Sequence, residues 1–411
     1  MKQLHKLVME SSHDLAAIIT RENGKPFKEA KAEVASSASF IEFYAEECSR
    51  IQGTMQKEGD RCLMVMKEAI GPAALITPWN FPSSMLARKF APALAAGCTV
   101  IAKPAHETPL SALAMAHLVE KAGFPKGSFN VITCDEGNVE SVVDSLLQSD
   151  KVKKVSFTGS TSVGKKIAEK SMKTLKRLSM ELGGNAPVIV FEDAKEIKGG
   201  LDSVVDAVIA SKFRNSGQTC VCANRIFVHA LLHDEFVEKL ARAVRKLKVG
   251  NGFDENVNQG PLLSIESVEK VEMLMKDAMQ KGAKMIVGGN RLSLIGKHFY
   301  EPTLLTNCDK SMQIFNEEIF GPIAAVYKFN QNISELANDC RHGLAAYIFT
   351  NNLSKSMQAI QDLEYGMIGV NEGIISTVHA PFGGVKDSGF GREGSHAGIE
   401  EYLQTKYICI K

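Results

Sequence analysis

The stretch KVSFTGSTSVGKKIAEK, residues 154–170, decides the fold class of this chain. Val155 and Phe157 predict a short strand, the residues from Gly159 to Gly164 predict a tight turn, and the following residues have helical spacing. A strand that leads through such a turn into a helix is the unit from which parallel sheets are built. The backbone N–H groups at the start of the helix would face an anion. The stretch therefore predicts an α/β protein.

The turn itself leaves two interpretations open. It nearly matches a P-loop, but Lys166 stands where the magnesium-binding Ser or Thr is required, which disfavours a nucleotide triphosphatase. It also does not follow the G-x-G-x-x-G pattern of the usual dinucleotide-binding fold. A purely structural turn is about as well supported as a phosphate-binding one, so other motifs must decide.

Strand and helix patterns alternate outward from this stretch. The first series of strands predicts a doubly wound parallel sheet: 73–77, 99–103, 128–133, 154–157 and 188–191, with helices such as 111–122 and 139–147 between them. A second series predicts another α/β domain beyond about Glu181: 225–229, 284–287, 324–329 and 346–350. Residues 1 to about 50 predict two helices separated near Asn23–Pro26, and 52–67 predicts a hairpin. The terminal strand candidate 405–410 is expected to pair with a neighbouring subunit.

Composition limits the class of partner. The 411 residues are 45% hydrophobic and 23% charged, as expected of a globular protein with two or three domains. Forty-eight basic and 47 acidic residues give no electrostatic reason to expect nucleic acid or a membrane surface, so small molecules and other copies of the chain are the expected partners. Nine cysteines, no signal-like N-terminus and no apolar run near ~18 residues predict an intracellular protein. No metal site is expected, and the sequons at Asn332 and Asn352 are interpreted as chance matches.

A second informative stretch is FRNSGQTCVC, residues 213–222. The apolar residues 204–213 have helical spacing, Asn215–Gly217 predict the end of that helix, and ANRIFVHA alternates like a strand. Cys220 therefore lies on a polar helix-to-strand turn, which suits a thiolate that meets a ligand. A small core cysteine is an equally good interpretation from this pattern alone.

Two further motifs supply partners for such a cysteine. Asn80, in PWNFP, is a rigid neutral amide of the kind that an oxyanion hole requires. Glu181, in ELGG, follows a strand and precedes two glycines that permit close backbone approach, so its carboxylate could reach a ligand. Each has a simpler interpretation, as a turn-capping Asn and a solvated Glu. Together with Cys220 they make a nucleophile, an oxyanion donor and a base.

The motifs PWNFP, FTGSTSVG, MELGGNAP, GQTC, EEIFGP and PFGGVKDSG occur in the order found in the NAD(P)-dependent aldehyde dehydrogenase superfamily. The chain resembles that family over its whole length, and within it most resembles the succinate-semialdehyde dehydrogenase branch. The resemblance implies an α/β fold with a doubly wound cofactor domain (1–180), an α/β catalytic domain (181–370), a return to the first domain (371–411), and a small β element for oligomerisation that includes hairpin 52–67. It implies a homodimer or homotetramer in the mitochondrial matrix or cytoplasm.

The resemblance also implies roles for single residues. Cys220 would be the nucleophile, Glu181 the general base, and Asn80 with the Cys220 N–H the oxyanion hole. NAD or NADP, with NAD slightly favoured, would contact Trp79, Lys103, His106, Gly159, Ser160, Gly164, Glu318 and Phe320. His106 stands where NAD-preferring relatives often have an acid. The carboxylate of a semialdehyde would bind Arg88, Arg214, Ser376 and Phe382, although each arginine could instead pair with a local acid. Cys222 is a candidate redox partner for Cys220, or else a packing cysteine.

Other functions remain to be weighed against oxidation of succinate semialdehyde to succinate. The substrate could be another aldehyde, such as glutarate semialdehyde. A cysteine hydrolase would need a histidine base, and none of the ten histidines lies in a suitable motif. Relatives carry a further segment before the position of Met1, and residues 196–200 look like an insertion before the helix that leads to Cys220. A truncated, catalytically impaired homologue is therefore the remaining alternative.

Overall fold

The computed structural model describes residues 1–331 and 333–411, so the sequon at Asn332 lies outside the described residues. The chain begins with α1 (Lys2–Glu10), α2 (Ser12–Asn23) and α3 (Phe27–Glu47). The sequence predicted two helices here; the first is interrupted at Ser11, because adjacent serines favour helix ends over helix interiors. Helix α2 ends at Gly24 with φ 86°, the left-handed conformation that the Asn23–Pro26 turn predicted.

A six-stranded sheet holds the turn that decided the fold class. Its order is β17 (Gly389–Phe390), β7 (Arg177–Glu181), β6 (Lys154–Thr158), β3 (Ala73–Ile76), β4 (Val100–Lys103) and β5 (Phe129–Val131). All pairs are parallel except β17 with β7. The connecting helices are α4 (Ser84–Ala95), α5 (Pro109–Lys121), α6 (Val139–Gln148) and α7 (Thr161–Met172). The doubly wound pattern predicted from sequence is confirmed.

The strand order reverses between β3 and β6, and this reversal positions two motifs. Ile76 pairs with Phe157, so the turns that follow these two strands lie side by side. In open α/β sheets, ligands bind at such a switch point, beyond the carboxyl ends of the strands. The PWNFP motif and the Gly159–Gly164 turn are therefore brought together by topology alone.

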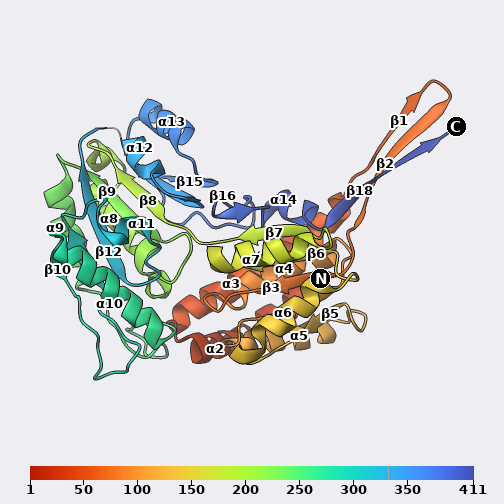
Figure 1. Ribbon diagram of the computed structural model, residues 1–411, viewed down its shortest axis with the longest axis horizontal. Helices are drawn as coiled ribbons and strands as arrows, with labels where there is room; N and C mark the ends of the chain where they lie inside the picture. Colours follow the sequence, from red (N-terminus) through yellow and green to blue (C-terminus); the bar gives the residue numbers. More distant parts are fainter. Residues whose placement is uncertain (332) are drawn as a thin grey trace.

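A seven-stranded sheet forms the second α/β unit (Figure 1). Its order is β10 (Lys284–Val287), β11 (Thr303–Thr306), β12 (Ile323–Phe329), β9 (Ala223–His229), β8 (Ala186–Val190), β14 (Ala345–Phe349) and β15 (Met367–Val370). The sequence had grouped strand 188–191 with the first sheet, which is wrong: β8 pairs with β9 and β14. Buried parallel strands have the same apolar pattern in either sheet, so periodicity could not assign the partner.

The helices of this unit include the one that leads to Cys220. They are α8 (Gly200–Phe213), α9 (His233–Val244), α10 (Ile265–Gln280), α11 (Gln313–Asn316), α12 (Ile333–Asn338) and α13 (Leu353–Asp362). Helix α8 is continuous after residues 196–200, because Gly199 and Gly200 absorb the turn at positive φ (87° and 63°). The predicted helix and strand on either side of Cys220 are both confirmed.

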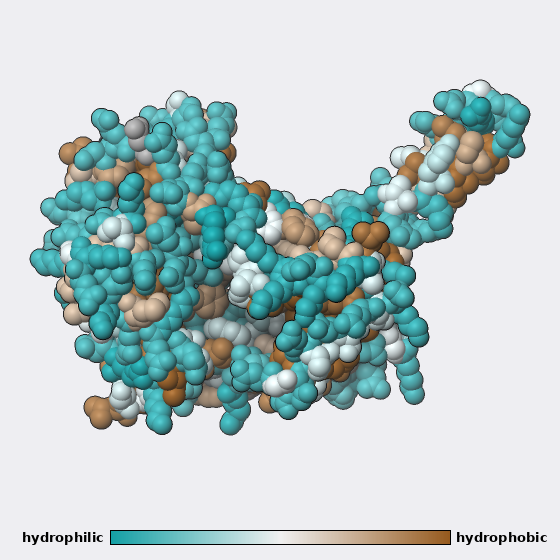
Figure 2. All heavy atoms as spheres, viewed as in Figure 1, coloured by the Kyte–Doolittle hydropathy of each residue, from teal (hydrophilic) through white to brown (hydrophobic). Residues whose placement is uncertain are grey.

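A three-stranded sheet of β1 (Thr54–Glu58), β2 (Arg61–Ala69) and β18 (Leu403–Ile410) forms an arm that projects from the rest of the molecule (Figures 1 and 2). The terminal strand was expected to pair with a neighbouring subunit. Along one edge it pairs with β2 of its own chain, from Leu403 opposite Ala69 to Ile410 opposite Cys62, and pairing of its other edge with a neighbouring subunit stays a prediction. In the hairpin, β2 has one unpaired edge, and β18 occupies it; the sequence pattern does not reveal this partner. The outer edge of β18 is itself unpaired within the described residues.

The remaining elements return the chain to the first unit. Strands β13 (His342–Gly343) and β16 (Val385–Lys386) pair, and α14 (Ser395–Glu400) packs against α3 and α4. Strand β17 adds the segment after β16 to the edge of the six-stranded sheet at Glu181. Across the described ranges, no helix has both the length and the apolar character needed to cross a bilayer.

Candidate active site

Cys220 lies at the end of a turn with unusual backbone geometry. Asn215, Ser216 and Gly217 all have positive φ, at 48°, 58° and 75°. For Asn and Ser this conformation costs ~1–3 kcal/mol each, and such strain is concentrated at functional sites. A Cβ on Gly217 would lie 2.2 Å from the Gly321 carbonyl oxygen, so glycine is required there. The turn is held in a shape that its own sequence disfavours.

The Cys220 side chain is half-buried between two cavities. A Cβ on Gly184 would lie 2.2 Å from the Cys220 carbonyl oxygen, so the ELGG motif packs directly on the cysteine. Burial and the nearby Glu318 carboxyl raise the pKa of Cys220 to about 12. The sulfur is therefore a thiol at neutral pH, and its activation requires a base.

Asn80 is buried and fixed to the cysteine turn by two hydrogen bonds. Its Nδ2 donates to the Gln218 carbonyl at 2.9 Å, and its backbone carbonyl accepts from Asn215 Nδ2 at 2.9 Å. One of the two Nδ2 hydrogens is thus engaged with the turn, and the amide also lines the cavity that contains Cys220. The structure brings Asn80 and Cys220 together as the sequence predicted.

Glu181 ends β7 and is 3% exposed. Neither carboxylate oxygen has a hydrogen-bond partner among the described residues. Burial, followed by the neighbouring Glu393 carboxylate, raises the pKa of Glu181 well above its usual value. Glu181 does not line either of the described cavities beside Cys220. The sequence placed it as a carboxylate that reaches a ligand, whereas here it is a buried, unpartnered group close enough to Cys220 to affect the pKa of the thiol.

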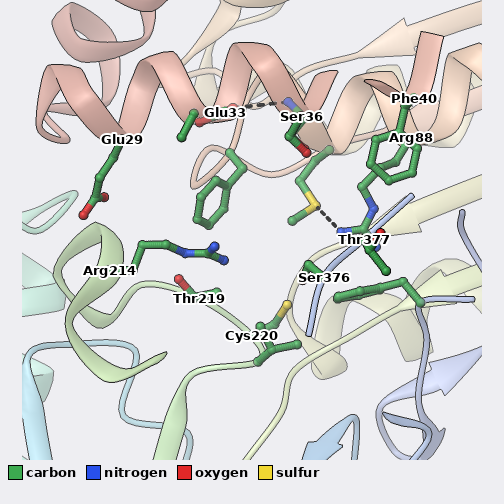
Figure 3. Close-up of a pocket in the computed structure, with 16 residues that line it drawn as sticks. Glu29, Glu33, Ser36, Phe40, Arg88, Arg214, Thr219, Cys220, Ser376 and Thr377 are labelled. Atoms are coloured by element: carbon green, nitrogen blue, oxygen red, sulfur yellow. Dashed lines mark hydrogen bonds between the residues drawn. The ribbon is translucent and has the colours of Figure 1, made fainter. Parts of the chain in front are cut away.

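The first cavity beside Cys220, of about 210 Å³, contains two arginines (Figure 3). Arg214 makes no ion pair within 4.0 Å to any described residue, and its guanidinium carbon lies 5.2 Å from the Phe81 ring centroid. Arg88 differs, because its Nε lies 2.8 Å from Glu393. The expected alternative, pairing with an acid, therefore applies to Arg88, although the acid is distant in sequence. Ser376 and Phe382 also line the cavity, and the Phe382 ring stacks on Arg88 at 3.7 Å.

A second cavity, of about 290 Å³, lies on the other side of Cys220. Trp79 and Phe320 both line it and are in edge-to-face contact, with ring centroids 5.7 Å apart. Phe320 has φ 53°, a costly conformation for a bulky residue. Glu318 accepts a hydrogen bond from the Gly184 N–H at 3.0 Å, and burial raises the pKa of Glu318 to about 7.

The second cavity is contiguous with a third, of about 570 Å³, because both are lined by Trp79, Gly159 and Ser160. Ser160 caps α7, whose first-turn N–H groups lack helical partners. Cβ atoms on Gly159 and Gly164 would lie 2.4 Å from Phe157 and 2.3 Å from Leu182, so a larger residue at either position would displace these side chains. Gly159 lines the cavity, whereas Gly164, a predicted cofactor contact, lies behind it against Leu182. The far end contains the remaining predicted contacts, Lys103 and His106.

Cys222 is buried, and its sulfur donates to the Lys212 carbonyl at 3.0 Å. All nine cysteines lie in the described residues and none is in a disulfide. The role of Cys222 as a redox partner stays a prediction. Within residues 1–331 and 333–411, no cluster of three His, Cys, Asp or Glu side chains is arranged to hold a metal ion.

The sequence analysis missed several charged residues at the site. Lys89 and Glu393 form a buried ion pair beside Arg88, and Lys25 and Glu33 form another beneath Asn80. Lys89 and Glu33 carry a charge at helix positions that face the core, a signal that could have found them. Lys25 and Glu393 lie outside helices, and no sequence signal marks them as buried.

These features define a class of protein. The model of the aldehyde dehydrogenase family matches residues 1–408, and the chain belongs to that family. It is therefore an NAD(P)-dependent oxidoreductase with the aldehyde dehydrogenase fold.

Individual relatives and solved structures are similar to this chain over its whole length. The chain is 50% identical to the mitochondrial succinate-semialdehyde dehydrogenase of Oryza sativa subsp. japonica, covering 100% of this chain and 77% of the relative. It is 48% identical to a glutarate-semialdehyde dehydrogenase of Pseudomonas putida, covering 100% and 84%. The crystal structure of a succinate-semialdehyde dehydrogenase from Burkholderia pseudomallei has a TM-score of 0.96 and 49% identity, covering 100% of this chain and 84% of that one.

The donors along the two contiguous cavities fit a nicotinamide dinucleotide. Gly159, Ser160 and the N-terminus of α7 line the third cavity, and the unpaired N–H groups of that helix end suit a diphosphate. Glu318 and Lys103 provide an acceptor and a donor for ribose hydroxyls, and the Trp79 and Phe320 rings lie at the Cys220 end.

Proposed function

We propose that this protein oxidises succinate semialdehyde to succinate with NAD or NADP. One observation carries the proposal: Arg214, a guanidinium without an ion-pair partner among the described residues, shares a cavity with Cys220. A guanidinium binds a carboxylate through two parallel hydrogen bonds. A small aldehyde that carries a carboxylate would occupy this cavity with its carbonyl toward the sulfur.

The first chemical step uses Cys220 and Asn80. The sulfur attacks the aldehyde carbon and forms a tetrahedral thiohemiacetal. Its oxyanion receives the Nδ2 hydrogen of Asn80 that is not bonded to Gln218, together with the Cys220 N–H. The raised pKa of Cys220 means that a proton must first be removed, and we assign this step to Glu181, whose carboxylate has no hydrogen-bond partner among the described residues.

The second half of the reaction releases the acid. A nicotinamide held at the Cys220 end by Trp79 and Phe320 would supply a hydride acceptor, and loss of hydride from the thiohemiacetal carbon leaves a thioester on Cys220. Once Glu181 has released the Cys220 proton to solvent, it takes a proton from water. The water attacks the thioester, the bond to Cys220 breaks, and succinate and the Cys220 thiolate are freed. Burial raises the pKa of Glu181, which makes its carboxylate a stronger base than a solvent-exposed one.

For cofactor choice, we propose a slight preference for NAD. The Glu107 carboxylate lies 3.3 Å from His106 in the third cavity, where a 2′-phosphate would meet a like charge. His106 alone does not repel a phosphate. Lys103 and Lys166 line the same cavity and keep the preference small.

For assembly, we propose a homodimer or homotetramer that uses the projecting arm. The arm exposes large apolar side chains and an open edge on β18: Met55 is 71% exposed, Tyr407 62% and Ile410 51%. An exposed apolar sheet of this kind is a contact surface for another copy. The nine free cysteines support a reducing compartment, either the mitochondrial matrix or the cytoplasm.

Glutarate semialdehyde is the second candidate substrate, favoured by the likeness to the Pseudomonas putida enzyme. It is one methylene longer, a difference worth only about 1–3 kcal/mol in a pocket. The test is reduction of NAD and of NADP by the purified protein with succinate semialdehyde, glutarate semialdehyde, acetaldehyde and an ester. A higher kcat/KM for succinate semialdehyde supports the proposal. Activity on acetaldehyde alone, ester hydrolysis alone, or no turnover would contradict it, the last in favour of an impaired homologue.

A further inference from the structure

Charged residues on the N-terminal helices lie against the loops that carry Asn80 and Cys220. Lys25 precedes α3, and Glu29 and Glu33 lie one turn apart on that helix; Figure 3 shows the two acids above Arg214 and Cys220. Lys25 Nζ and Glu33 Oε2 are 2.6 Å apart, and both side chains are 0% exposed. A buried ion pair contributes little net stability, because desolvation costs several kcal/mol per ion. The contacts of this pair with the Asn80 loop therefore indicate a role other than stability.

Lys25 contacts the loop of Asn80 directly. Its Nζ donates to the Asn80 carbonyl at 2.7 Å and lies 3.8 Å from the centroid of the Phe81 ring. A charged donor to a buried carbonyl makes a stronger hydrogen bond than a neutral one. The ammonium thus fixes the peptide that bears the proposed oxyanion donor.

Glu33 holds the other end of the same loop. Its Oε1 accepts from the backbone N–H of Ser83 at 2.9 Å and of Ser84 at 3.2 Å, at the start of α4. The Ser83 side chain does not cap this helix, so the carboxylate supplies the cap from another helix. One ion pair therefore anchors the segment from Asn80 to Ser84 at both ends.

The same helix also holds the cysteine turn. Glu29 Oε2 accepts from the Asn215 N–H at 2.8 Å, and Asn215 Nδ2 donates to the Asn80 carbonyl at 2.9 Å. The Asn80 carbonyl consequently receives hydrogen bonds from both Lys25 and Asn215. Lys25 and the acids of α3 therefore hold both the strained turn before Cys220 and the loop that carries Asn80.

We propose that Lys25 and Glu33 are positioning residues that fix the Asn80 amide relative to Cys220 and act on the reaction only through Asn80. This inference rests on the proposed function, in which Asn80 stabilises the oxyanion. The hydrogen bonds of both residues go to each other and to main-chain atoms of the 80–84 segment. A displacement of about 1 Å at a reacting group can cost about 100-fold in rate.

The experiment is a double-mutant cycle on kcat with succinate semialdehyde. The variant K25M/E33Q removes both charges together, so that no lone buried charge remains. In the native background it is expected to lower kcat about 10- to 100-fold while KM changes less than about threefold. In the N80A background, itself slowed about 100- to 1,000-fold, the same change is expected to lower kcat less than about threefold.

A matched control separates positioning from loss of stability. Lys154 and Glu401 form another ion pair, 3.0 Å apart, with Lys154 0% exposed. K154M/E401Q is expected to lower the melting temperature comparably and to leave kcat within about threefold of the native value. Equal losses of kcat in this control and in K25M/E33Q would overturn the proposal.

The remaining outcomes are also decisive. Equal effects of K25M/E33Q in the native and N80A backgrounds, or no effect in the native one, would overturn the positioning role while leaving the proposed function intact. An N80A variant with undiminished kcat would contradict the oxyanion role of Asn80 and, with it, the positioning role. No turnover of succinate semialdehyde by the native protein would contradict the proposed function instead. If K25M/E33Q is unfolded by circular dichroism, the cycle is repeated with K25R, which keeps the charge but changes the donor geometry. A kcat loss in K25R that disappears in N80A supports the proposal, and a loss that persists, or no loss, overturns it.

Discussion

The cavities on the two sides of Cys220 differ in the groups that shape them: charged side chains on one side and closely packed backbone on the other. On the side of the first cavity, the proposed function depends on two charged side chains, Arg214 and Arg88, that project from a turn and a helix. On the side of the second and third cavities, it depends on backbone shape, because the close packing of Gly159, Gly164 and Gly184 leaves little room for a Cβ. The difference suggests that specificity on the first side changes with one charge, whereas the second side tolerates few changes of any kind.

The largest effect is expected at Cys220, which lines the cavities on both sides. Replacing Cys220 with Ala removes the nucleophile and should lower NAD(P)H formation by at least about 10⁴-fold, because no other group can form the thioester. Cofactor binding, measured by fluorescence titration, should stay within about threefold of the native value. Full turnover by this variant would contradict the proposed mechanism.

The next largest effect is expected at Arg214, in the first cavity. Arg214→Leu should raise KM for succinate semialdehyde about 10- to 100-fold, because a charge-assisted hydrogen bond contributes about 1.5–3 kcal/mol. KM for an uncharged aldehyde such as butanal should change less than about threefold.

Arg242→Leu on the exposed face of α9 is the matched control, and it should change neither KM. Equal increases for both aldehydes in Arg214→Leu would show that the residue shapes the cavity without recognising a carboxylate.

The backbone-built side is tested by Gly164→Val. A side chain there collides with Leu182 at 2.3 Å and displaces the start of α7. The cofactor Kd should rise about tenfold or more, measured by titration calorimetry. Glu169→Val, on the exposed face of the same helix, adds the same β-branched residue without the collision and should leave Kd nearly unchanged. Similar Kd values for the two variants would show that close packing at Gly164 does not contribute to cofactor binding.

The smallest expected effect is a pH dependence at Glu318. Its pKa is raised to about 7, so raising the pH from 6 to 8 converts it to the carboxylate that accepts ribose hydroxyls. Cofactor affinity should therefore rise with pH by at most about tenfold, and Glu318→Gln should flatten the profile. Because the folded-state pKa lies above the unfolded one, the same group lowers the free energy of unfolding as pH rises through about 7, and the variant should lose that dependence. An unchanged profile in Glu318→Gln would assign the titration to another group.

Much of the fold followed from local pattern. The strand, turn and helix of residues 154–170, and the helix and strand around Cys220, were predicted because hydrophobic period and turn residues are local signals. The interruption at Ser11 was missed, because a one-residue break does not disturb the helical period. Asn80 and Cys220 could be paired only through motifs whose order matched a known family.

Sequence by itself determined the alternation of strands and helices, the strand, turn and helix of residues 154–170, and the two elements on either side of Cys220. Tertiary structure alone decided which sheet received β8, that β18 closed on its own hairpin, and that Arg88 met Glu393 while Arg214 met no acid among the described residues. It also brought Lys25, Glu33 and Asn80 together from separate elements. Period and turn chemistry act between near neighbours in the chain, whereas strand partners and buried ion pairs depend on how distant segments pack, which no local pattern encodes.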